Sequence, residues 1–486
     1  MKKILFVASE CVPFIKTGGL ADVVGSLPQK FNRESYDVRV MIPMYSCIPL
    51  KLRNTFSYID HFYLSLSDWV KDKYVGVFKT LLNGITYYFI DNQEYFYCDH
   101  PYGDVKRDIE RFAFFDKAVL SCLPIIDFKP DIIHCNDWQT GLIPVYLKTQ
   151  FRDSDFFSEI RTLITIHNLK FQGTWNVEYV RAITGLSNEV FTDDKLKFYK
   201  DGNLLKGGLV YSDYITTVSQ TYAQEIQTNE YGEGLEGLLY SRRLDMQGIV
   251  NGIDPEYFNP SGDTNLDAAY SWVDFRTQKP KNKKSLQKEL GLNLQPKKYL
   301  IGIVSRLTDQ KGMDLICAAI DEMMDEHTQF VVVGTGERKY EEALLYHASR
   351  FPGQMAVHIG YSEKLSQRVY AGADALLMPS LFEPCGLSQL IALRYGTVPI
   401  VRETGGLKDT VLPYNQYEHS GIGFSFRHYS LDDMLGTIQY SRTVFIHHKR
   451  EWNQMIERGM RTDYSWDRSK NKYEELYYYL TERETN

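Results

Sequence analysis

Short apolar runs recur along the chain, and each is followed by a glycine turn and a longer segment with helical periodicity. In the first half they predict strands at residues 4–9, 38–43, 131–135, 163–167, 214–219 and 247–252. In the second half they predict strands at residues 300–305, 330–336, 356–361, 375–380 and 398–403. Strands that alternate with helices are typical of βαβ units and parallel sheets. The pattern therefore predicts an α/β fold with two doubly wound domains.

A polar stretch over 255–298 separates the two sets of predicted strands and shows no strand pattern. We expect an N-terminal domain over 1–254, a linker with one helix over 255–298, and a C-terminal domain over 299–486. The last segment, "SWDRSKNKYEELYYYL", predicts a helix whose docking the sequence leaves open. Two facing doubly wound domains bind ligands in a central cleft, at the carboxyl ends of their sheets.

Composition and charge narrow the class of protein. The length of 486 residues suggests two or three domains of about 150 to 250 residues each. A net charge of −7 and a pI near 5.9 argue against a partner such as nucleic acid or a membrane surface. Seven cysteines without a CxxC pair fit neither a disulfide framework nor a zinc site, so we expect a reducing cytoplasm.

The opening segment and the apolar runs predict no targeting signal. The first apolar run ends at Ala8, shortly before Glu10, and is too short for a signal peptide. No segment approaches the roughly 20 apolar residues of a membrane span. We therefore expect a cytoplasmic protein that has no membrane partner.

The sequence TGGLxDxV occurs twice, within "KTGGLADVVGSLP" at 16–28 and within "ETGGLKDTVLP" at 403–413. In each copy two glycines precede an apolar-periodic run with an early aspartate, which predicts a helix that opens on a glycine loop. Free backbone N–H groups at such an end attract anions. The second copy, from Thr404 to Leu407, either contacts a phosphate or shapes the floor of the cleft.

Charged residues follow two predicted strands of the second half. Arg306 and Lys311 follow the strand at 300–305, and a bidentate fork with a point charge suits a diphosphate. Glu383 follows the strand at 375–380 and precedes a predicted helix, which would place it in the cleft. Solvated surface charge is the alternative for each. Cys385 has no histidine beside it in sequence, so a small packed residue is favoured over a nucleophile.

Other motifs are weaker. Gly334 and Gly336 in "VVVGTGERK" lack the third glycine of a dinucleotide fingerprint, so a nucleotide could approach them but an NAD site is not expected. His134, Asp137 and His167 stand near strand ends without a compact metal-ligand spacing. We therefore predict no metal site.

Six motifs together resemble the family of ADP-glucose-dependent bacterial glycogen synthases, which is shared with plant starch synthases. They are "KTGGLADVVGSLP", "HCNDWQTGLIP", "TIHNLKFQG", "SRLTDQKG", "FEPCGLSQL" and "YGTVPIVRETGGLKDTV". The resemblance implies a GT-B fold with two Rossmann-like domains. It also implies retaining transfer of glucose from ADP-glucose to an α-1,4-glucan such as glycogen, with no metal and no other cofactor.

The resemblance assigns donor contacts to both halves of the chain. Lys16, with Gly18 and Gly19, matches donor-binding positions of the first domain. Arg306 and Lys311 match the positions that hold the diphosphate in the second domain.

Further residues match positions around the transferred glucose. Glu383 matches the family's cleft glutamate, and the residues beside it match positions next to the sugar and phosphate: Cys385, Gly386 and Leu387. The main-chain carbonyl of His167 would face the glucose, with Asp137 nearby, and Tyr361 would stack on adenine. Many retaining GT-B enzymes carry a second glutamate in an E-x7-E pattern, where this chain has Ile391.

Three other functions remain open at this point. An α-glucan phosphorylase would carry pyridoxal phosphate and a far longer chain, and another GT-B hexosyltransferase would ignore glycogen. A catalytically inactive glucan-binding protein is the third. Four residues that occur together in this chain argue against it, because simple binding needs none of them: Lys16, Arg306, Lys311 and Glu383.

Overall fold

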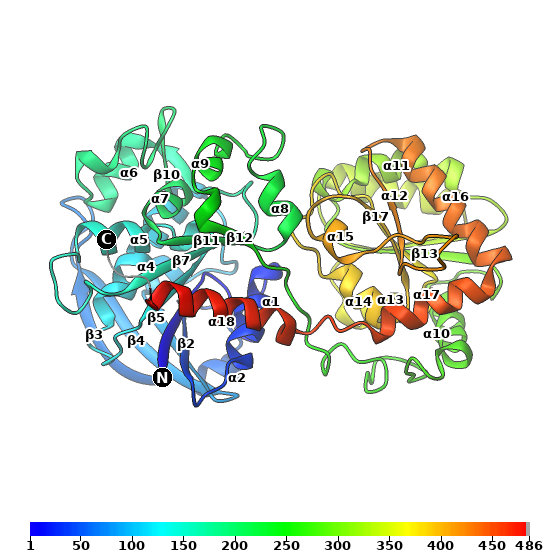
Figure 1. Ribbon diagram of the computed structural model, residues 1–486, viewed down its shortest axis with the longest axis horizontal. Coiled ribbons are helices and arrows are strands. Elements are labelled where there is room, and N and C mark those ends of the chain that lie inside the picture. The colour runs from blue at the N-terminus through cyan, green and yellow to red at the C-terminus, as the bar shows by residue number, and fades with distance from the viewer. Residues whose placement is uncertain (483–486) are drawn as a thin grey trace. The chain divides into compact units, whose positions relative to one another are not determined.

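The structure is a computed structural model that describes residues 1–482 and divides into two α/β units (Figure 1). Unit 1 comprises Met1–Val218, Ala223–Ile249 and the chain from Trp466 onward. Unit 2 comprises Ser219–Tyr222 and Val250–Ser465. The helix α8 (Gln220–Glu225) spans a boundary of this division.

Unit 1 contains a nine-stranded sheet in the order β12-β11-β7-β6-β1-β2-β5-β4-β3 and a small sheet in the order β8-β10-β9. The strands are β1 (Lys2–Val7), β2 (Tyr36–Pro43), β3 (Ser57–Leu64), β4 (Lys73–Leu82), β5 (Ile85–Asp91), β6 (Ile132–Asn136), β7 (Arg161–Ile166), β8 (Thr174–Asn176), β9 (Lys197–Phe198), β10 (Asp201–Asn203), β11 (Tyr214–Thr217) and β12 (Met246–Gly248). The helices are α1 (Gly19–Ser26), α2 (Leu50–Arg53), α3 (Gln93–Phe96), α4 (Val105–Cys122), α5 (Leu142–Thr149), α6 (Val177–Thr184), α7 (Leu204–Tyr211), α9 (Glu236–Ser241) and α18 (Trp466–Glu482).

The centre of the large sheet is parallel and buried on both faces. Strand β1 pairs with β2 on one side and with β6 on the other, and its side chains from Ile4 to Val7 are fully buried. Burial on both faces requires a continuous apolar run, which is why the hydrophobic pattern predicts these strands. The antiparallel edge formed by β3, β4 and β5 is not predicted, because β3 is largely exposed and mixes aromatic with polar residues.

Unit 2 contains a six-stranded parallel sheet in the order β15-β14-β13-β16-β17-β18. The strands are β13 (Tyr299–Val304), β14 (Thr328–Gly334), β15 (Met355–Ile359), β16 (Ala375–Met378), β17 (Val398–Arg402) and β18 (Phe424–Phe426). The helices are α10 (Phe275–Glu289), α11 (Met313–Met323), α12 (Arg338–Arg350), α13 (Glu363–Gly372), α14 (Ser388–Arg394), α15 (Gly405–Thr410), α16 (Leu431–His447) and α17 (Lys449–Arg461). Its core includes the buried chains of β13 and β16.

The expected linker over 255–298 is instead part of unit 2, where α10 packs against α13. Its lysine-rich sequence suggests a solvated segment, but Lys279 and Lys283 are buried. The Lys279 ammonium donates to the carbonyls of Tyr370 and Ala371 at 3.1 and 2.8 Å. Lys283 pairs with Asp374 at 2.5 Å. These contacts join distant parts of the sequence, so the local pattern does not reveal them.

The C-terminal helix α18 belongs to unit 1, where it contacts β6. The hydroxyl of Tyr477 lies 2.8 Å from Nδ1 of His134, whose Nε2 lies 2.6 Å from the hydroxyl of Thr165. All three side chains are buried. His134, which stands at a strand end in the sequence, is therefore a core residue that joins the last helix to the sheet.

His134 predicts a pH dependence of stability. Burial lowers the pKa of His134 to about 3, so the imidazole stays neutral in the folded state while an unfolded chain takes up a proton near its ordinary value of 6.5. As the pH falls from 6.5 toward 3, the free energy of unfolding therefore decreases by about 1.4 kcal/mol per pH unit because of this group. We expect His134→Gln to lower the free energy of unfolding by about 1 to 3 kcal/mol at pH 7.5, where a buried hydrogen-bonding pair is broken.

The difference between wild type and His134→Gln should shrink as the pH falls from 6.5 toward 5, because only the wild type contains the neutral buried imidazole. Denaturant unfolding of both proteins at several pH values measures this difference. A difference that stays constant over this pH range would contradict the prediction.

Candidate active site

The carboxyl edge of the unit 1 sheet gathers polar residues where the strand order reverses. From β1 the chain continues to β2 on one side, and β6 lies on the other. Such a switch point is where open α/β sheets bind ligands. Glu10 follows β1, Asp137 follows β6, and His167 follows β7, which pairs with β6.

Asp137 and His167 are joined by hydrogen bonds. Oδ1 of Asp137 accepts the backbone N–H of His167 at 2.7 Å, and Nε2 of His167 lies 2.9 Å from Oδ1 of Asn136. Since that amide oxygen only accepts, Nε2 donates and Nδ1 is left as the acceptor. Burial lowers the pKa of His167 to about 3 and raises the pKa of Asp137 to about 7. The imidazole of His167 is therefore neutral, and the hydrogen bond from its backbone N–H to Asp137 fixes the turn that begins at His167.

The first TGG copy is held by a carboxylate that the sequence analysis did not select. The buried Glu10 accepts hydrogen bonds from the backbone N–H of Thr17 and from its hydroxyl, the latter at 2.8 Å. Burial raises the pKa of Glu10, against these hydrogen bonds. A carboxylate three residues beyond a buried parallel strand is a signal that could have been used, since that edge of a sheet binds ligands.

Lys16 and the two glycines lie at the start of α1. Nζ of Lys16 pairs with Asp22 at 2.7 Å, with 43% of the lysine side chain exposed. Gly18 precedes α1 in an extended conformation, and a Cβ there would lie 3.8 Å from Oε1 of Glu10, an ordinary contact. Gly19 is the first residue of the helix and is exposed. The start of the first copy is therefore accessible to solvent, with the partly exposed Lys16 ammonium beside it.

Unit 2 brings three predicted residues to the carboxyl edge of its sheet, at the switch point between β13 and β16. Lys311 pairs with Glu383 at 2.5 Å, and the hydroxyl of Ser380 donates to the same carboxylate oxygen at 3.1 Å. Glu383 is 5% exposed. Arg306 is exposed, and its guanidinium lies 3.4 Å from Oε1 of Gln310. The arrangement combines a buried ion pair with a second cation nearby in the sequence.

The second TGG copy supports the loop that carries Glu383. Gly405 has a positive φ of 43°, and a Cβ there would lie 2.0 Å from the carbonyl oxygen of Glu383. A Cβ at Gly406 would lie 2.1 Å from the carbonyl oxygen of Cys385. The backbone N–H of Gly406 donates to the Glu383 carbonyl at 3.1 Å. The side chain of Thr404 is fully buried, so it cannot touch a ligand without a change in the fold.

Arg402 is a second residue that the sequence analysis did not select. It is buried, and its guanidinium donates to the carbonyl of Leu381 at 2.5 Å. From the other side, Gln310 accepts the backbone N–H of Leu381 through its carbonyl at 2.9 Å. The loop that carries Glu383 is thus fixed by three segments.

Close packing explains why glycine stands at positions 334 and 336. A Cβ at Gly334 would lie 1.9 Å from the carbonyl oxygen of Ser305, and one at Gly336 would lie 2.2 Å from that of Leu307. The backbone around Arg306 therefore leaves no room for a side chain at either position. Both glycines support the segment that presents Arg306.

The remaining predicted residues differ in exposure. Burial raises the pKa of the Cys385 thiol to about 12, which agrees with a packed residue and not with a nucleophile. Gly386 has a φ of 75°, and Leu387 precedes the short helix α14. Tyr361 follows β15 and is 76% exposed. Its ring is available for stacking at the same edge as Arg306.

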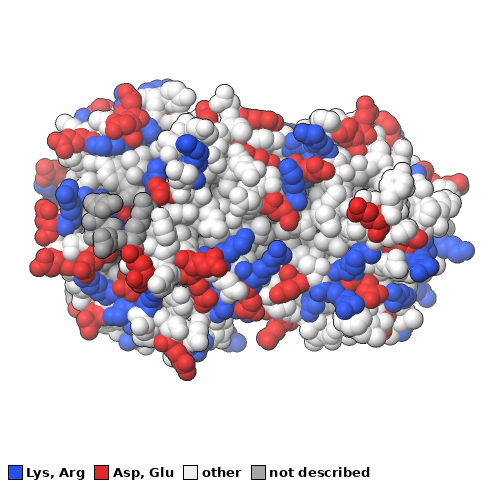
Figure 2. Space-filling model, viewed as in Figure 1, with Lys and Arg blue, Asp and Glu red and all other residues white. Residues whose placement is uncertain are grey.

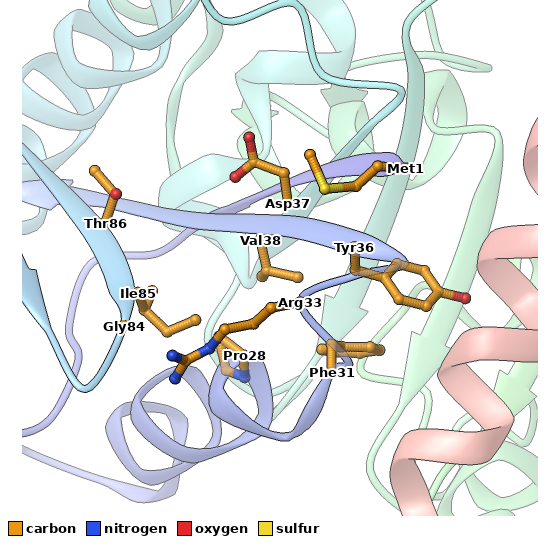
Figure 3. A pocket seen from close by; sticks show the side chains of 10 residues that line it. All are labelled: Met1, Pro28, Phe31, Arg33, Tyr36, Asp37, Val38, Gly84, Ile85 and Thr86. Carbon is orange, nitrogen blue, oxygen red and sulfur yellow. The ribbon is translucent and has the colours of Figure 1, made fainter.

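A cavity of about 190 Å³ lies away from these residues, at the amino ends of β2 and β5 in unit 1 (Figure 3). The Arg33 guanidinium lies against Gly84 there and donates to the carbonyl of Asn83. The lining contains none of the predicted site residues.

The surface charge, the metal-ligand groups and the helices add three observations. On the face shown in Figure 2, acidic and basic side chains are interspersed over each unit. Within residues 1–482, no cluster of three or more histidine, cysteine, aspartate or glutamate side chains is placed to hold a metal ion. In the same part of the chain, no helix has the length and apolar character to cross a bilayer.

Comparison with known proteins defines the class. The family model of the starch synthase catalytic domain matches residues 3–241, and the model of glycosyl transferases group 1 matches residues 285–439. The catalytic domain of starch synthase IV from Arabidopsis thaliana, solved with ADP and acarbose, superposes with a TM-score of 0.90 at 31% identity and covers 99% of this chain and 100% of that one. Sucrose-phosphate synthase from Thermosynechococcus elongatus shares the fold, with a TM-score of 0.61 at 17% identity.

The fold and the matched domains define a glycosyltransferase of the GT-B class, which confirms the predicted α/β fold and enzyme class. The glycogen synthase of Lachnospira eligens is 57% identical over 477 residues, which cover 98% of this chain and 99% of that protein. That of Geobacillus stearothermophilus is 48% identical over 482 residues, with 99% and 98% covered. The chain belongs to the family of bacterial glycogen synthases, as the sequence motifs predict.

Proposed function

We propose that this enzyme transfers glucose from ADP-glucose to the non-reducing end of an α-1,4-glucan, with retention of configuration and without a metal ion. The observation that carries the proposal is the Lys311–Glu383 ion pair near Arg306 at the switch point of the unit 2 sheet. Two cations at this edge suit a diphosphate. The related starch synthase IV was solved with ADP, which supports an adenine nucleotide as the donor.

The proposed chemistry breaks the bond between glucose C1 and the diphosphate oxygen. Negative charge grows on that oxygen, and Arg306 and Lys311 stabilise it electrostatically. The acceptor's 4-hydroxyl attacks C1 from the face that the diphosphate leaves, and a phosphate oxygen takes its proton. Glu383 holds Lys311 in place, because its carboxylate accepts a hydrogen bond from the Lys311 ammonium.

Residues of unit 1 complete the proposed set. Lys16, Gly18 and Gly19 bind the donor, and the main-chain carbonyl of His167 faces the transferred glucose. Asp137 accepts a hydrogen bond from the backbone N–H of His167 and so fixes the turn that carries this carbonyl. In unit 2, the exposed ring of Tyr361 stacks on adenine.

We also propose a cytoplasmic location. All seven cysteines are free thiols, and three of them are fully buried: Cys11, Cys122 and Cys135. Free thiols persist in a reducing compartment.

An assay with purified protein tests the function. ADP-glucose or UDP-glucose is supplied with and without glycogen, and nucleoside diphosphate release is compared with glucose incorporated into polymer. We expect ADP-glucose to support glycogen-dependent release that matches incorporation and survives a chelator. Release without incorporation would indicate another acceptor, a preference for UDP-glucose would overturn the donor, and loss with the chelator would overturn metal independence.

A further inference from the structure

The β3–β4 hairpin lies at the edge of the large sheet (Figure 1). It carries a row of aromatic rings outside the site described above. The row, which we call the aromatic row, consists of Tyr58, His61, Tyr63, Tyr74 and Phe78. Tyr58 and Tyr63 are 53% and 66% exposed. Large apolar side chains gathered on one exposed face indicate a binding surface.

The rings of the aromatic row contact one another without a break. The centroid of Tyr58 lies 5.5 Å from Phe78 and 6.3 Å from His61. His61 stacks near Tyr74 at 5.7 Å, and Tyr74 lies 6.1 Å from Tyr63. The Tyr58 hydroxyl is also 2.6 Å from Nδ1 of His61. These contacts order the rings before any ligand binds, which lowers the entropic cost of binding.

A glycine shapes the middle of the row. A Cβ at Gly76 would lie 2.8 Å from the hydroxyl oxygen of Tyr74 and 3.0 Å from its Cε1. The absence of that Cβ lets the Tyr74 ring lie across its own strand. The Tyr74 ring supports its exposed neighbours, since it stacks near His61 and lies edge-to-face with Tyr63. The exposed rings of Tyr58 and Tyr63 are the ones that can stack on the apolar face of a sugar ring.

The charge on this face disfavours an anionic ligand, because the carboxylate of Asp91 lies on the same face opposite Gly76, beside the aromatic row. The lysines of β4, Lys73 and Lys79, alternate with Tyr74 and Phe78 and therefore point to the opposite face of the sheet. The hydroxyls of the tyrosines and the imidazole of His61 supply hydrogen-bonding groups instead. Rings with hydroxyl and imidazole edges suit a polyhydroxylated ligand, and the absence of a cation from the row disfavours a nucleic acid.

The length of the row favours a polymer. Tyr58 and Tyr63 are five residues apart on one strand, which corresponds to roughly 16 Å. This length exceeds one monosaccharide, so a chain of several sugar units would be needed to cover the rings.

The edge of β3 itself is poorly suited to pairing with a second copy of the chain. The register between β3 and β4 shifts between Tyr58 and Asp60, which marks a bulge. Bulges and charged residues on an edge strand oppose edge-to-edge pairing. The exposed face therefore remains the surface available to a ligand.

We propose that the aromatic row is a second binding site for linear α-1,4-glucan, which anchors the polymeric acceptor away from the reacting ends. The proposal rests on the proposed function, because it takes its ligand from the acceptor of that reaction. Anchoring at one site raises the effective concentration of chain ends at another. In the sheet, β2 and β5 lie between β1 and this hairpin, so the row is separate from the carboxyl-edge residues of unit 1.

The double variant Tyr58→Ala, Tyr63→Ala tests the proposal. Both side chains are largely exposed, so the fold should survive, and thermal unfolding checks this. Migration in native gels that contain glycogen measures binding without any donor. We expect an affinity about tenfold weaker than that of wild type. The matched control removes two exposed tyrosines elsewhere, Tyr240→Ala and Tyr417→Ala, and should migrate as wild type does.

Kinetics supply the second readout. The KM for glycogen should rise about tenfold in the test variant, while kcat and the KM for ADP-glucose stay unchanged, since a remote anchor adds only binding energy. The KM for maltotriose, which is too short to span the row, should not change. Unchanged migration in glycogen gels would overturn the proposal, and so would a wild-type dimer in sedimentation that the variant dissociates. Because the gels need no turnover, this result is independent of the proposed transfer reaction.

Discussion

Replacing Lys311 with alanine is expected to lower kcat by about 10²- to 10³-fold, the usual effect of losing one group that stabilises charge in a transition state. The Lys311 ammonium lies 2.5 Å from Glu383, at the sheet edge where we place the leaving diphosphate. Its removal takes away that charge and also leaves a buried carboxylate without its cation. Initial rates with ADP-glucose and glycogen measure the loss.

The control is Lys288→Ala, which removes an exposed lysine from the last turn of α10 in the same unit. It should retain the wild-type kcat. Thermal unfolding of both variants separates a loss of chemistry from a loss of fold. If Lys311→Ala kept its kcat within about threefold of wild type while folded, the proposed role in stabilising the leaving group would be wrong.

Replacing Gly406 with alanine is expected to reduce both activity and stability. The new Cβ would lie 2.1 Å from the carbonyl oxygen of Cys385 and 2.4 Å from its Cα, so the backbone must shift. Overpacking of this kind costs about 1 to 3 kcal/mol. The loop that moves also carries Glu383, and a displacement of about 1 Å at a reacting group can lower kcat by about 10²-fold.

Gly436→Ala is the matched control, because a Cβ at Gly436 meets no heavy atom within 4 Å. This residue lies inside α16, where alanine should stabilise the helix by about 0.5 to 1 kcal/mol. Denaturant unfolding and kcat are measured for both variants. Wild-type stability and activity in Gly406→Ala would contradict the proposed support of the Glu383 loop by the second TGG copy.

The two TGG copies show how far a local pattern can be read. Both copies predict a helix that opens on a glycine loop, and both helices, α1 and α15, are present. The copies differ in what surrounds them. Gly18 has room for a Cβ, whereas Gly405 and Gly406 are pressed against the backbone of the Glu383 loop. The distance along the chain between these partners hides this difference from the sequence.

The site residues divide in the same way. Arg306, Lys311 and Glu383 stand next to strands that the hydrophobic pattern predicts, so their gathering at one sheet edge follows from parallel topology. Glu10 and Arg402 were not selected, because each acts through backbone groups of other segments. Their partners become neighbours only after the sheet forms.

The sequence by itself determined most of the parallel strands of both units, with β5 and β18 missed, and also the family and the motif residues near the strand ends. Each of these depends on local periodicity or on short runs of residues, which folding does not alter. The tertiary structure alone decided that α10 belongs to unit 2 and α18 to unit 1, and that the edge hairpin carries the aromatic row. The physical reason is that buried lysines, close backbone contacts and cross-strand ring pairs join residues far apart in sequence, and their energies appear only when the chain has packed.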